Sequence, residues 1–126
     1  MTAHIIADRP LTVAVRWIAR VWAAALVLFW GSFFVHHVVE WLTDPRGWPP
    51  PWVVAVLGLH GLMLAGLVIG WRWEVAGAVL VLATAVPFFA LAAGRNAPLF
   101  AAVTAVPAVL WLWCGWQAWR AGPSAR

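Results

Sequence analysis

The sequence predicts an all-α fold, an integral membrane four-helix bundle with up-down-up-down connectivity. Three observations lead to this prediction. Four apolar runs of about twenty residues, each free of formal charge, fill most of the 126-residue chain. Hydrophobic residues make up 65% of the chain and charged residues only 10%, which is far from the balance of a soluble domain. The connections after the second and third runs are short, and short connections make neighbouring helices antiparallel.

The length of the runs identifies them as membrane spans. A helix of about twenty residues is about 30 Å long, which matches the hydrocarbon core of a bilayer. A soluble domain of this size could not bury four such segments on all sides. We therefore expect a single transmembrane domain over residues 1–126, with helices at about 12–42, 52–70, 75–94 and 98–119.

The first helix is expected to follow a short polar tail formed by residues 1–9. Asp8 is the predicted capping residue, and Pro10 lies in the predicted first turn. The segment shows no small-residue cleavage site, so it is interpreted as a signal anchor that stays in the protein. The helix should end near Leu42, because residues 43–51 contain four prolines and one glycine.

Tight turns separate the remaining helices. Residues 71–74 and 95–97 are interpreted as turns at the membrane interface. Most of the 12 tryptophans lie near the ends of the apolar runs, as in the aromatic belts of membrane proteins. Trp30 and Trp111 lie deeper in their runs, and they are the candidates for contact with a cofactor or pigment.

The arginines predict the orientation of the chain. The two termini and the second connection share one side of the membrane and hold six arginines, whereas Arg46 and Arg95 lie on the other side. The positive-inside rule then places both termini in the cytoplasm and the protein in the inner membrane of the cell. The arginines are scattered singly, so no nucleic-acid partner is expected. The lone Cys114 excludes an intrachain disulfide and a cysteine-based metal site.

Small residues mark a possible packing face on the second helix. Gly66 and Gly70 form a GxxxG pattern, and Gly58 and Gly61 lie close to the same stripe. In lipid, such faces let two helix backbones approach closely. The interpretation is packing within the bundle, with dimerisation as the alternative.

The same tetrapeptide, Thr-Ala-Val-Pro, occurs on the third and the fourth helix. Pro87 and Pro107 should each kink a helix and free a backbone carbonyl one turn back. Thr84 and Thr104, three residues earlier, are expected to help satisfy the opened backbone. Kinks at this depth favour a small cavity in the outer half of the bundle.

Ionisable side chains inside membrane segments are costly and indicate a functional site. The candidates are His36, His37, Glu40 and His60. The first three can share a broad helix face, and His60 should lie at a similar depth on the neighbouring helix.

Four uses of this His/Glu cluster remain open from the sequence. The first use is structural hydrogen bonding between helices. The second is a site that relays protons or ions or binds a small ligand. The cluster can hold a b-type haem between His60 and His36 or His37, with Gly58 and Gly61 giving room beside the ring. It can also bind zinc or copper, although His36 and His37 point about 100° apart on a helix. No cofactor is predicted.

The cytoplasmic turn carries an expected ion pair between Arg72 and Glu74, with Arg16 or Arg20 as other partners for Glu74. The sequence shows no nucleophile beside a base, no phosphate-binding loop and no dinucleotide fingerprint. We therefore do not expect an enzyme.

Several features of the chain occur together: Arg16 and Arg20 before an aromatic first helix, the His-Gly-Leu-Met segment from His60, the segment 71–77 and Pro107. In these features the sequence resembles a family of uncharacterised small four-helix membrane proteins of bacteria and archaea. The His36-His37 pair departs from the pattern, in which an acidic residue is commoner. The resemblance implies the four-helix architecture and no activity.

These observations favour a non-catalytic membrane protein. The expected role is an accessory or structural subunit that packs against a larger membrane complex or against copies of itself. A minimal transporter or ion relay that uses the His/Glu cluster is the first alternative, and a haem-binding electron-transfer anchor is the second.

Overall fold

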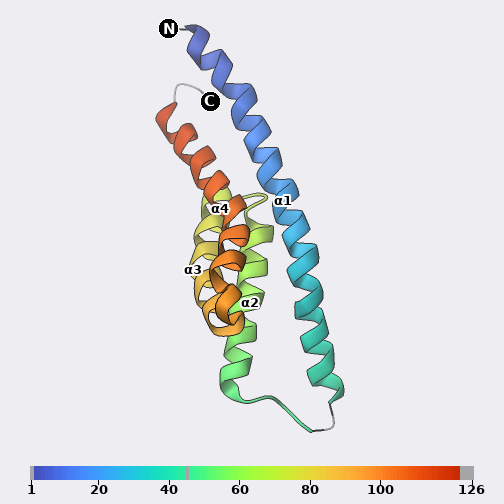
Figure 1. Ribbon diagram of the computed structural model, residues 1–126. Helices are drawn as coiled ribbons and strands as arrows, with labels where there is room; N and C mark the ends of the chain where they lie inside the picture. The colour runs from blue at the N-terminus through green and yellow to red at the C-terminus, as the bar shows by residue number, and fades with distance from the viewer. Residues whose placement is uncertain (1, 45, 123–126) are drawn as a thin grey trace.

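The computed structural model describes residues 2–44 and 46–122, with side chains from Pro10 onward. These residues form four α-helices and one 3-10 turn (Figure 1). Their order is α1 (Thr2–Thr43), α2 (Pro51–Ile69), α3 (Glu74–Ala92), η1 (Gly94–Asn96) and α4 (Ala97–Arg120). The all-α, four-helix fold predicted from the sequence is confirmed.

The predicted start of the first helix is wrong. α1 begins at Thr2 and continues through Pro10, where the sequence predicts a polar tail and a first turn. A proline inside a helix removes one backbone hydrogen bond, but the chain can remain helical on both sides of it. The predicted cap by the Asp8 side chain, and the Arg9 and Arg126 side chains used to predict orientation, lie outside the described side chains.

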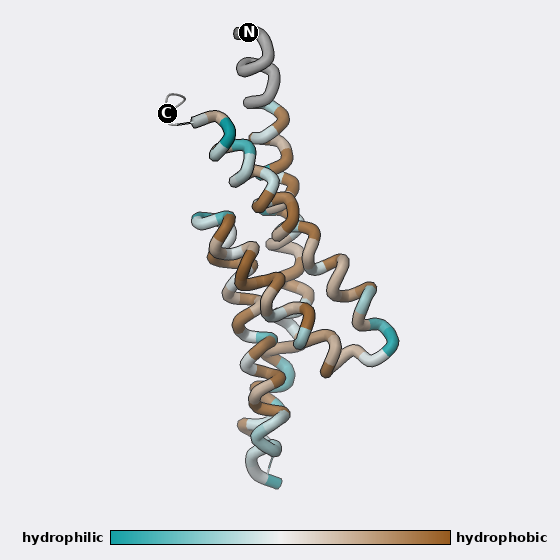
Figure 2. Tube along the Cα trace, turned by 90° about the vertical axis from the view of Figure 1, so that its left-hand side faces the viewer, coloured by the Kyte–Doolittle hydropathy of each residue, from teal (hydrophilic) through white to brown (hydrophobic). Residues whose placement is uncertain are grey.

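The helices have the length and composition of membrane spans. Within the described residues, four segments are long and apolar enough to cross a bilayer: Pro10–Thr43, Pro51–Ile69, Glu74–Ala92 and Gly94–Arg120. Hydrophobic residues dominate the helices, and the α1–α2 connection and the chain near the C-terminus are hydrophilic (Figure 2). These features indicate a membrane protein whose outer surface contacts lipid.

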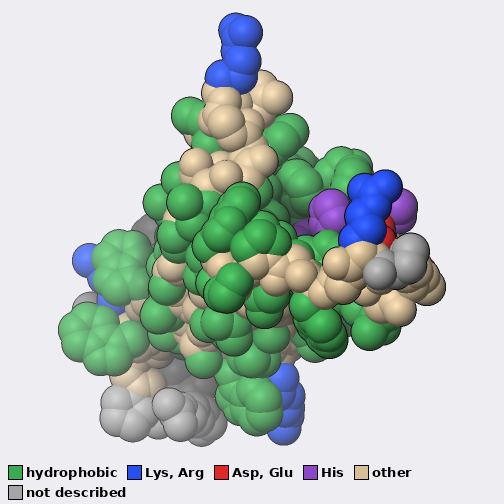
Figure 3. Space-filling model, turned by 90° about the horizontal axis from the view of Figure 1, so that it is seen from below, with side chains coloured by type: hydrophobic (Ala, Val, Ile, Leu, Met, Phe, Trp, Pro, Cys, Tyr) green, Lys and Arg blue, Asp and Glu red, His purple; other side chains and the backbone are tan. Residues whose placement is uncertain are grey.

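The bundle consists of a compact part and one looser helix. α3 contacts α2 and α4 extensively, whereas α1 contacts α4 and α2 over less of its length. Figure 1 shows α1 running obliquely past the other helices and extending beyond them at its N-terminal end. Seen from the end of the α1–α2 connection, the surface is largely hydrophobic, with histidine, arginine and acidic side chains at one edge (Figure 3).

Glycines bring α2 and α3 into backbone contact. A Cβ added at Gly66 would lie 2.9 Å from Val81 Cγ2 and 3.2 Å from the Gly77 carbonyl oxygen. Gly70 meets the backbone of Gly77 on one side and the ring of the fully buried Trp111 on the other. Gly66 and Gly70 therefore pack within the bundle. Gly58 has nothing within 4 Å of an added Cβ.

Two indoles on α1 bind α4 next to Pro107. The Trp22 indole nitrogen donates to the Val103 carbonyl oxygen at 3.1 Å, and Val103 is the residue one turn before Pro107 whose carbonyl the proline leaves free. The Trp30 indole nitrogen donates to Thr104 Oγ1 at 3.1 Å. Thr104 thus accepts a hydrogen bond between helices, and its expected help to the opened backbone stays a prediction.

Thr84 makes a different contact from the one expected beside Pro87. Its hydroxyl donates to the Leu80 carbonyl oxygen at 2.6 Å, one turn before Thr84 itself. The carbonyl freed by Pro87 belongs to Ala83, so this hydrogen bond does not replace the missing proline N–H. Thr84 is buried and links consecutive turns of α3.

In the ion pair at the α2–α3 turn, the partner of Glu74 is Arg16 and not Arg72. The Arg16 guanidinium of α1 pairs with the Glu74 carboxylate, with Arg16 Nη2 3.2 Å from Glu74 Oε2. Arg72 is exposed, and no ion pair joins it to Glu74 in the described part of the chain. The Glu74 side chain is only 14% exposed. Because a buried carboxylate is costly without a close counter-charge, Arg16 of the neighbouring helix is a better partner than the exposed Arg72. Arg20 donates to the Trp71 carbonyl oxygen at 3.2 Å and fixes the same end of α1.

Candidate functional site

The structure divides the predicted His/Glu cluster into two parts. His60 of α2 points into the bundle and is 2% exposed. His36 and Glu40 of α1 are exposed, and His37 lies between the two parts. The four side chains therefore do not form one site.

His60 is held by aromatic rings from two neighbouring helices. Its imidazole stacks on the Phe88 ring of α3, with 4.5 Å between the ring centroids. The Phe34 ring of α1 meets it edge-on at 5.4 Å. These ring contacts fix the plane of the imidazole, and the Trp30 backbone also interacts with it as a hydrogen-bond partner. The Nε2 atom is buried and has no hydrogen-bond partner among the described residues.

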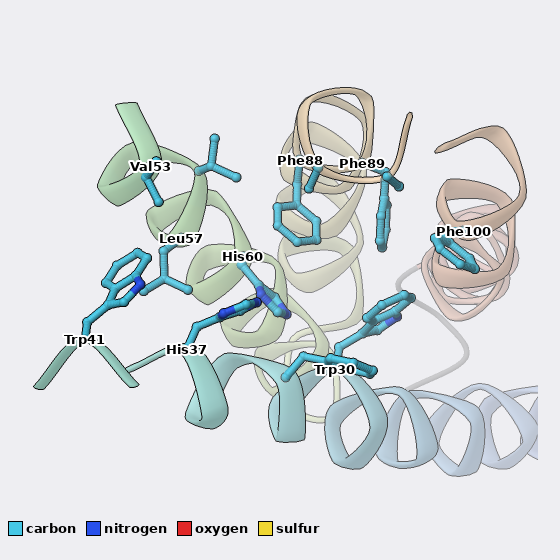
Figure 4. Close-up of a pocket in the computed structure, with 13 residues that line it drawn as sticks. Trp30, His37, Trp41, Val53, Leu57, His60, Phe88, Phe89 and Phe100 are labelled. Atoms are coloured by element: carbon cyan, nitrogen blue, oxygen red, sulfur yellow. The ribbon is translucent and has the colours of Figure 1, made fainter. Parts of the chain in front are cut away.

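A cavity of about 390 Å³ lies beside this imidazole, between α1 and the other helices (Figure 4). Its volume falls in the range of about 300–1,000 Å³ that is typical of small-molecule sites. His60 and His37 contribute the two imidazoles of its wall, and both lie near its centre in Figure 4. Much of the remaining wall is aromatic: Trp30, Phe33, Trp41, Phe88, Phe89 and Phe100.

His37 lies at the border between the cavity and the surface. It lines the cavity, yet its side chain is 49% exposed. Its Nδ1 atom is 3.7 Å from Glu40 Oε2, which is too long for a hydrogen bond. The His36 ring is 5.9 Å from the His37 ring and lies outside the cavity. His37 and His60, rather than His36 and His60, are therefore the histidines that share a site.

The other part of the cluster belongs to an exposed face of α1, here called the α1 flank: Phe29, Phe33, His36 and Glu40. The Phe29 and Phe33 side chains are about half exposed and their rings are 5.3 Å apart. Glu40 is 58% exposed. The residues follow one another at intervals of four, three and four, so they form one straight stripe along the helix.

The metal and haem alternatives depend on where the candidate ligands and Gly58 and Gly61 lie. Among the described residues, no group of three or more His, Cys, Asp or Glu side chains is placed to hold a metal ion. Gly58 and Gly61 do not line the cavity, so they do not make room beside a ring there. Gly61 instead faces the Phe34 ring, 3.3 Å from an added Cβ.

The aromatic wall is the feature that sequence reasoning missed. Trp30, a candidate because of its depth, does line the cavity, whereas Trp111 packs on Gly70. Phe88 and Phe89 follow Pro87 directly, and Phe100 lies in the first turn of α4. The available signal was a cluster of phenylalanines near the end of α3 and the start of α4.

Chemically, the cavity offers aromatic surface and one buried nitrogen. It brings together no nucleophile with a base and no pair of carboxylates in the described residues. The arrangement can bind a molecule, and nothing in it points to bond-making chemistry.

Comparison with known proteins gives a family and no activity. No curated protein and no solved structure matches the chain. One family model matches residues 7–124, which is nearly the whole chain, and its description is a domain of unknown function, DUF7670. The resemblance to an uncharacterised family is thereby confirmed, and the match spans all the helices described above from residue 7 onward. The chain belongs to the DUF7670 family.

Proposed function

We propose that the protein is a non-catalytic subunit of a larger membrane complex and that it binds its partner through the α1 flank. One observation carries the proposal: a straight stripe of two aromatic and two ionisable side chains is exposed on the helix that the bundle holds least.

The composition of the α1 flank is unfavourable for contact with lipid alone. His36 lies six residues before Leu42, about 9 Å into the span from the outer end of α1. Imidazole and carboxylate groups at such positions normally pair with other polar groups or face protein. A partner helix that donates to Glu40 and to His36 would satisfy both.

The spacing of the α1 flank also fits a helix partner. Intervals of four and three residues are those at which one helix inserts side chains between the side chains of another. By contrast, the lipid-facing side of α3 presents aliphatic residues such as Val79 and Val86, both exposed. The α1 flank therefore differs from a surface that serves lipid alone.

We further propose that this subunit lies in the inner membrane of the cell, with both termini in the cytoplasm. Arg16, Arg20, Arg72 and Arg120 lie at the end of the bundle that carries the termini, and Arg46 and Arg95 lie at the other end. This asymmetry is the one that the positive-inside rule describes.

The relay alternative finds less support. A relay across the membrane needs titratable groups through its whole thickness. Among the described residues, the buried polar side chains are His60, Thr84 and Thr104, and the core on the cytoplasmic side of His60 is formed by residues such as Met63 and Leu67.

Site-specific photo-crosslinking in native membranes tests the proposed subunit role. A photoreactive residue replaces Phe29 on the α1 flank, and the matched control replaces Val79 on α3, which is exposed to a similar degree (54% and 57%). We expect a discrete protein adduct from position 29 and lipid adducts from position 79. Lipid adducts from both positions would contradict the proposal. An adduct of twice the mass of the chain would show that the α1 flank binds a second copy of this chain and not a subunit of a larger complex.

A further inference from the structure

We propose that the cavity beside His60 is a binding site for a lipid-soluble molecule with a flat ring and a ring oxygen, the chemistry of a quinone or quinol head. This inference does not depend on a partner at the α1 flank, although Phe33 belongs to both surfaces. It stands on the shape and composition of the wall and on the buried nitrogen atom.

The wall favours a flat ring over a flexible chain. Trp30, Phe89 and Phe100 form a continuous aromatic group, with ring centroids 5.0 Å (Trp30 to Phe89), 5.4 Å (Trp30 to Phe100) and 5.9 Å (Phe89 to Phe100) apart. Phe88 adds a fourth ring beside His60. Aromatic surfaces gain from stacked and edge-on contacts with another ring beyond the area they bury.

The buried nitrogen requires a polar atom in the ligand. His60 is 2% exposed, and its Nε2 atom has no partner in the described residues. A buried polar group left unpaired loses its hydrogen bonds to water without replacement, which costs free energy. A lipid acyl chain in the cavity would leave that cost in place. A hydroxyl oxygen would remove it in either tautomer, and a carbonyl oxygen would remove it when Nε2 carries the proton, because a neutral imidazole has one donating and one accepting nitrogen.

The cavity is reachable from the membrane. Trp41 of α1 and Val53 of α2 lie on its wall next to the α1–α2 connection (Figure 4). His37 lines the cavity while half of its side chain is exposed, so the wall is open beside it. A ring with an apolar tail could enter there with its tail in lipid.

The experiment compares two flat probes with the same carbon skeleton, one with two ring carbonyls and one without oxygen. The first is 2,3-dimethyl-1,4-naphthoquinone, in which methyl groups block addition of the Cys114 thiol, and the second is 2,3-dimethylnaphthalene. Binding to the purified full-length protein in lipid nanodiscs is measured by calorimetry. We expect the quinone to bind at least tenfold more tightly than the hydrocarbon.

Variants locate the site. His60→Leu should weaken quinone binding at least tenfold and leave hydrocarbon binding unchanged. Trp119→Leu removes a ring with a polar nitrogen at a 79% exposed position outside the cavity, and it should leave both affinities as they are. Ala93→Phe fills the cavity and should weaken both probes, which keeps the test open if His60→Leu does not fold. Circular dichroism and thermal unfolding establish folding for each variant.

Three results would overturn the inference. Equal affinity for the two probes would make the cavity an apolar pocket for acyl chains. Quinone binding that survives both His60→Leu and Ala93→Phe would place the probe elsewhere. A shift of the haemin Soret band on addition of the wild type, absent with His60→Leu, together with no quinone binding, would make His60 a haem ligand.

Discussion

Gly77 is the residue whose size matters most for the packing of α2 on α3. A Cβ at this position would overlap the backbone of Gly70 and approach the Gly66 carbonyl oxygen. Backbone atoms cannot move aside as a flexible side chain can, so any larger residue must push the two helices apart. In a membrane this separation is costly, because close packing rather than the hydrophobic effect holds the helices together.

We therefore predict that Gly77→Ala destabilises the bundle by about 1–3 kcal/mol, the usual cost of overpacking. The matched control is Gly58→Ala, where nothing lies within 4 Å of the added Cβ. That change should be neutral or stabilising by up to about 1 kcal/mol through helix propensity. Reversible unfolding of the purified variants in mixed micelles measures both. A neutral Gly77→Ala would show that the helices separate without penalty.

At the scale of elements, α1 is joined to α4 by a hydrogen bond to the carbonyl that Pro107 leaves free. Pro107 has no N–H to donate, and the carbonyl of Val103 that it leaves free is the one that accepts from Trp22. The next residue, Thr104, accepts from Trp30 and is fully buried. Two tryptophans eight residues apart thus bind consecutive residues of α4 and set the rotation of α1.

A double-mutant cycle tests this pairing. Trp22→Phe should cost about 1 kcal/mol in the natural background, the scale of hydrogen bonds between membrane helices. In the Pro107→Ala background the cost should fall close to zero, because the introduced alanine supplies the N–H that the Val103 carbonyl lacks. Trp119→Phe, at a 79% exposed position, is the control for loss of an indole. Equal costs of Trp22→Phe in both backgrounds would refute the pairing.

The rotation of α1 also explains what the sequence could not reveal about the candidate site. The depth of the histidines follows from counting residues, and His37 and His60 do share a cavity. Which of two adjacent histidines faces inward depends on how α1 is turned. That angle is fixed by contacts with Val103 and Thr104, which lie far along the chain.

At the scale of the whole molecule, helix number and most helix ends were predictable, because prolines and long apolar runs act locally. Pro49, Pro50 and Pro51 mark the start of α2, and the turn after Gly70 follows from its interfacial residues. The start of α1 was not predictable from Pro10, because a proline permits a helix on either side of itself. The choice of Arg16 for Glu74 depends on tertiary contact between α1 and α3.

The proposed orientation is a property of the whole chain, and two exposed tryptophans allow its measurement. Trp48 lies in the α1–α2 connection and is 78% exposed, and Trp73 lies in the α2–α3 turn and is 64% exposed. In a Cys114→Ala background, we predict that Trp48→Cys reacts with a membrane-impermeant maleimide on intact cells. Trp73→Cys should react only after the cells are permeabilised. The reverse pattern would place the termini outside the cytoplasm.

The hydrogen bonds between α1 and α4 have a consequence for biosynthesis. Trp22 and Trp30 leave the ribosome early, yet the groups that they bind lie 81 and 74 residues later in the chain. α1 can therefore complete these two hydrogen bonds only after α4 has been made. A chain interrupted before α4 is left with an α1 that has no polar partner for either indole.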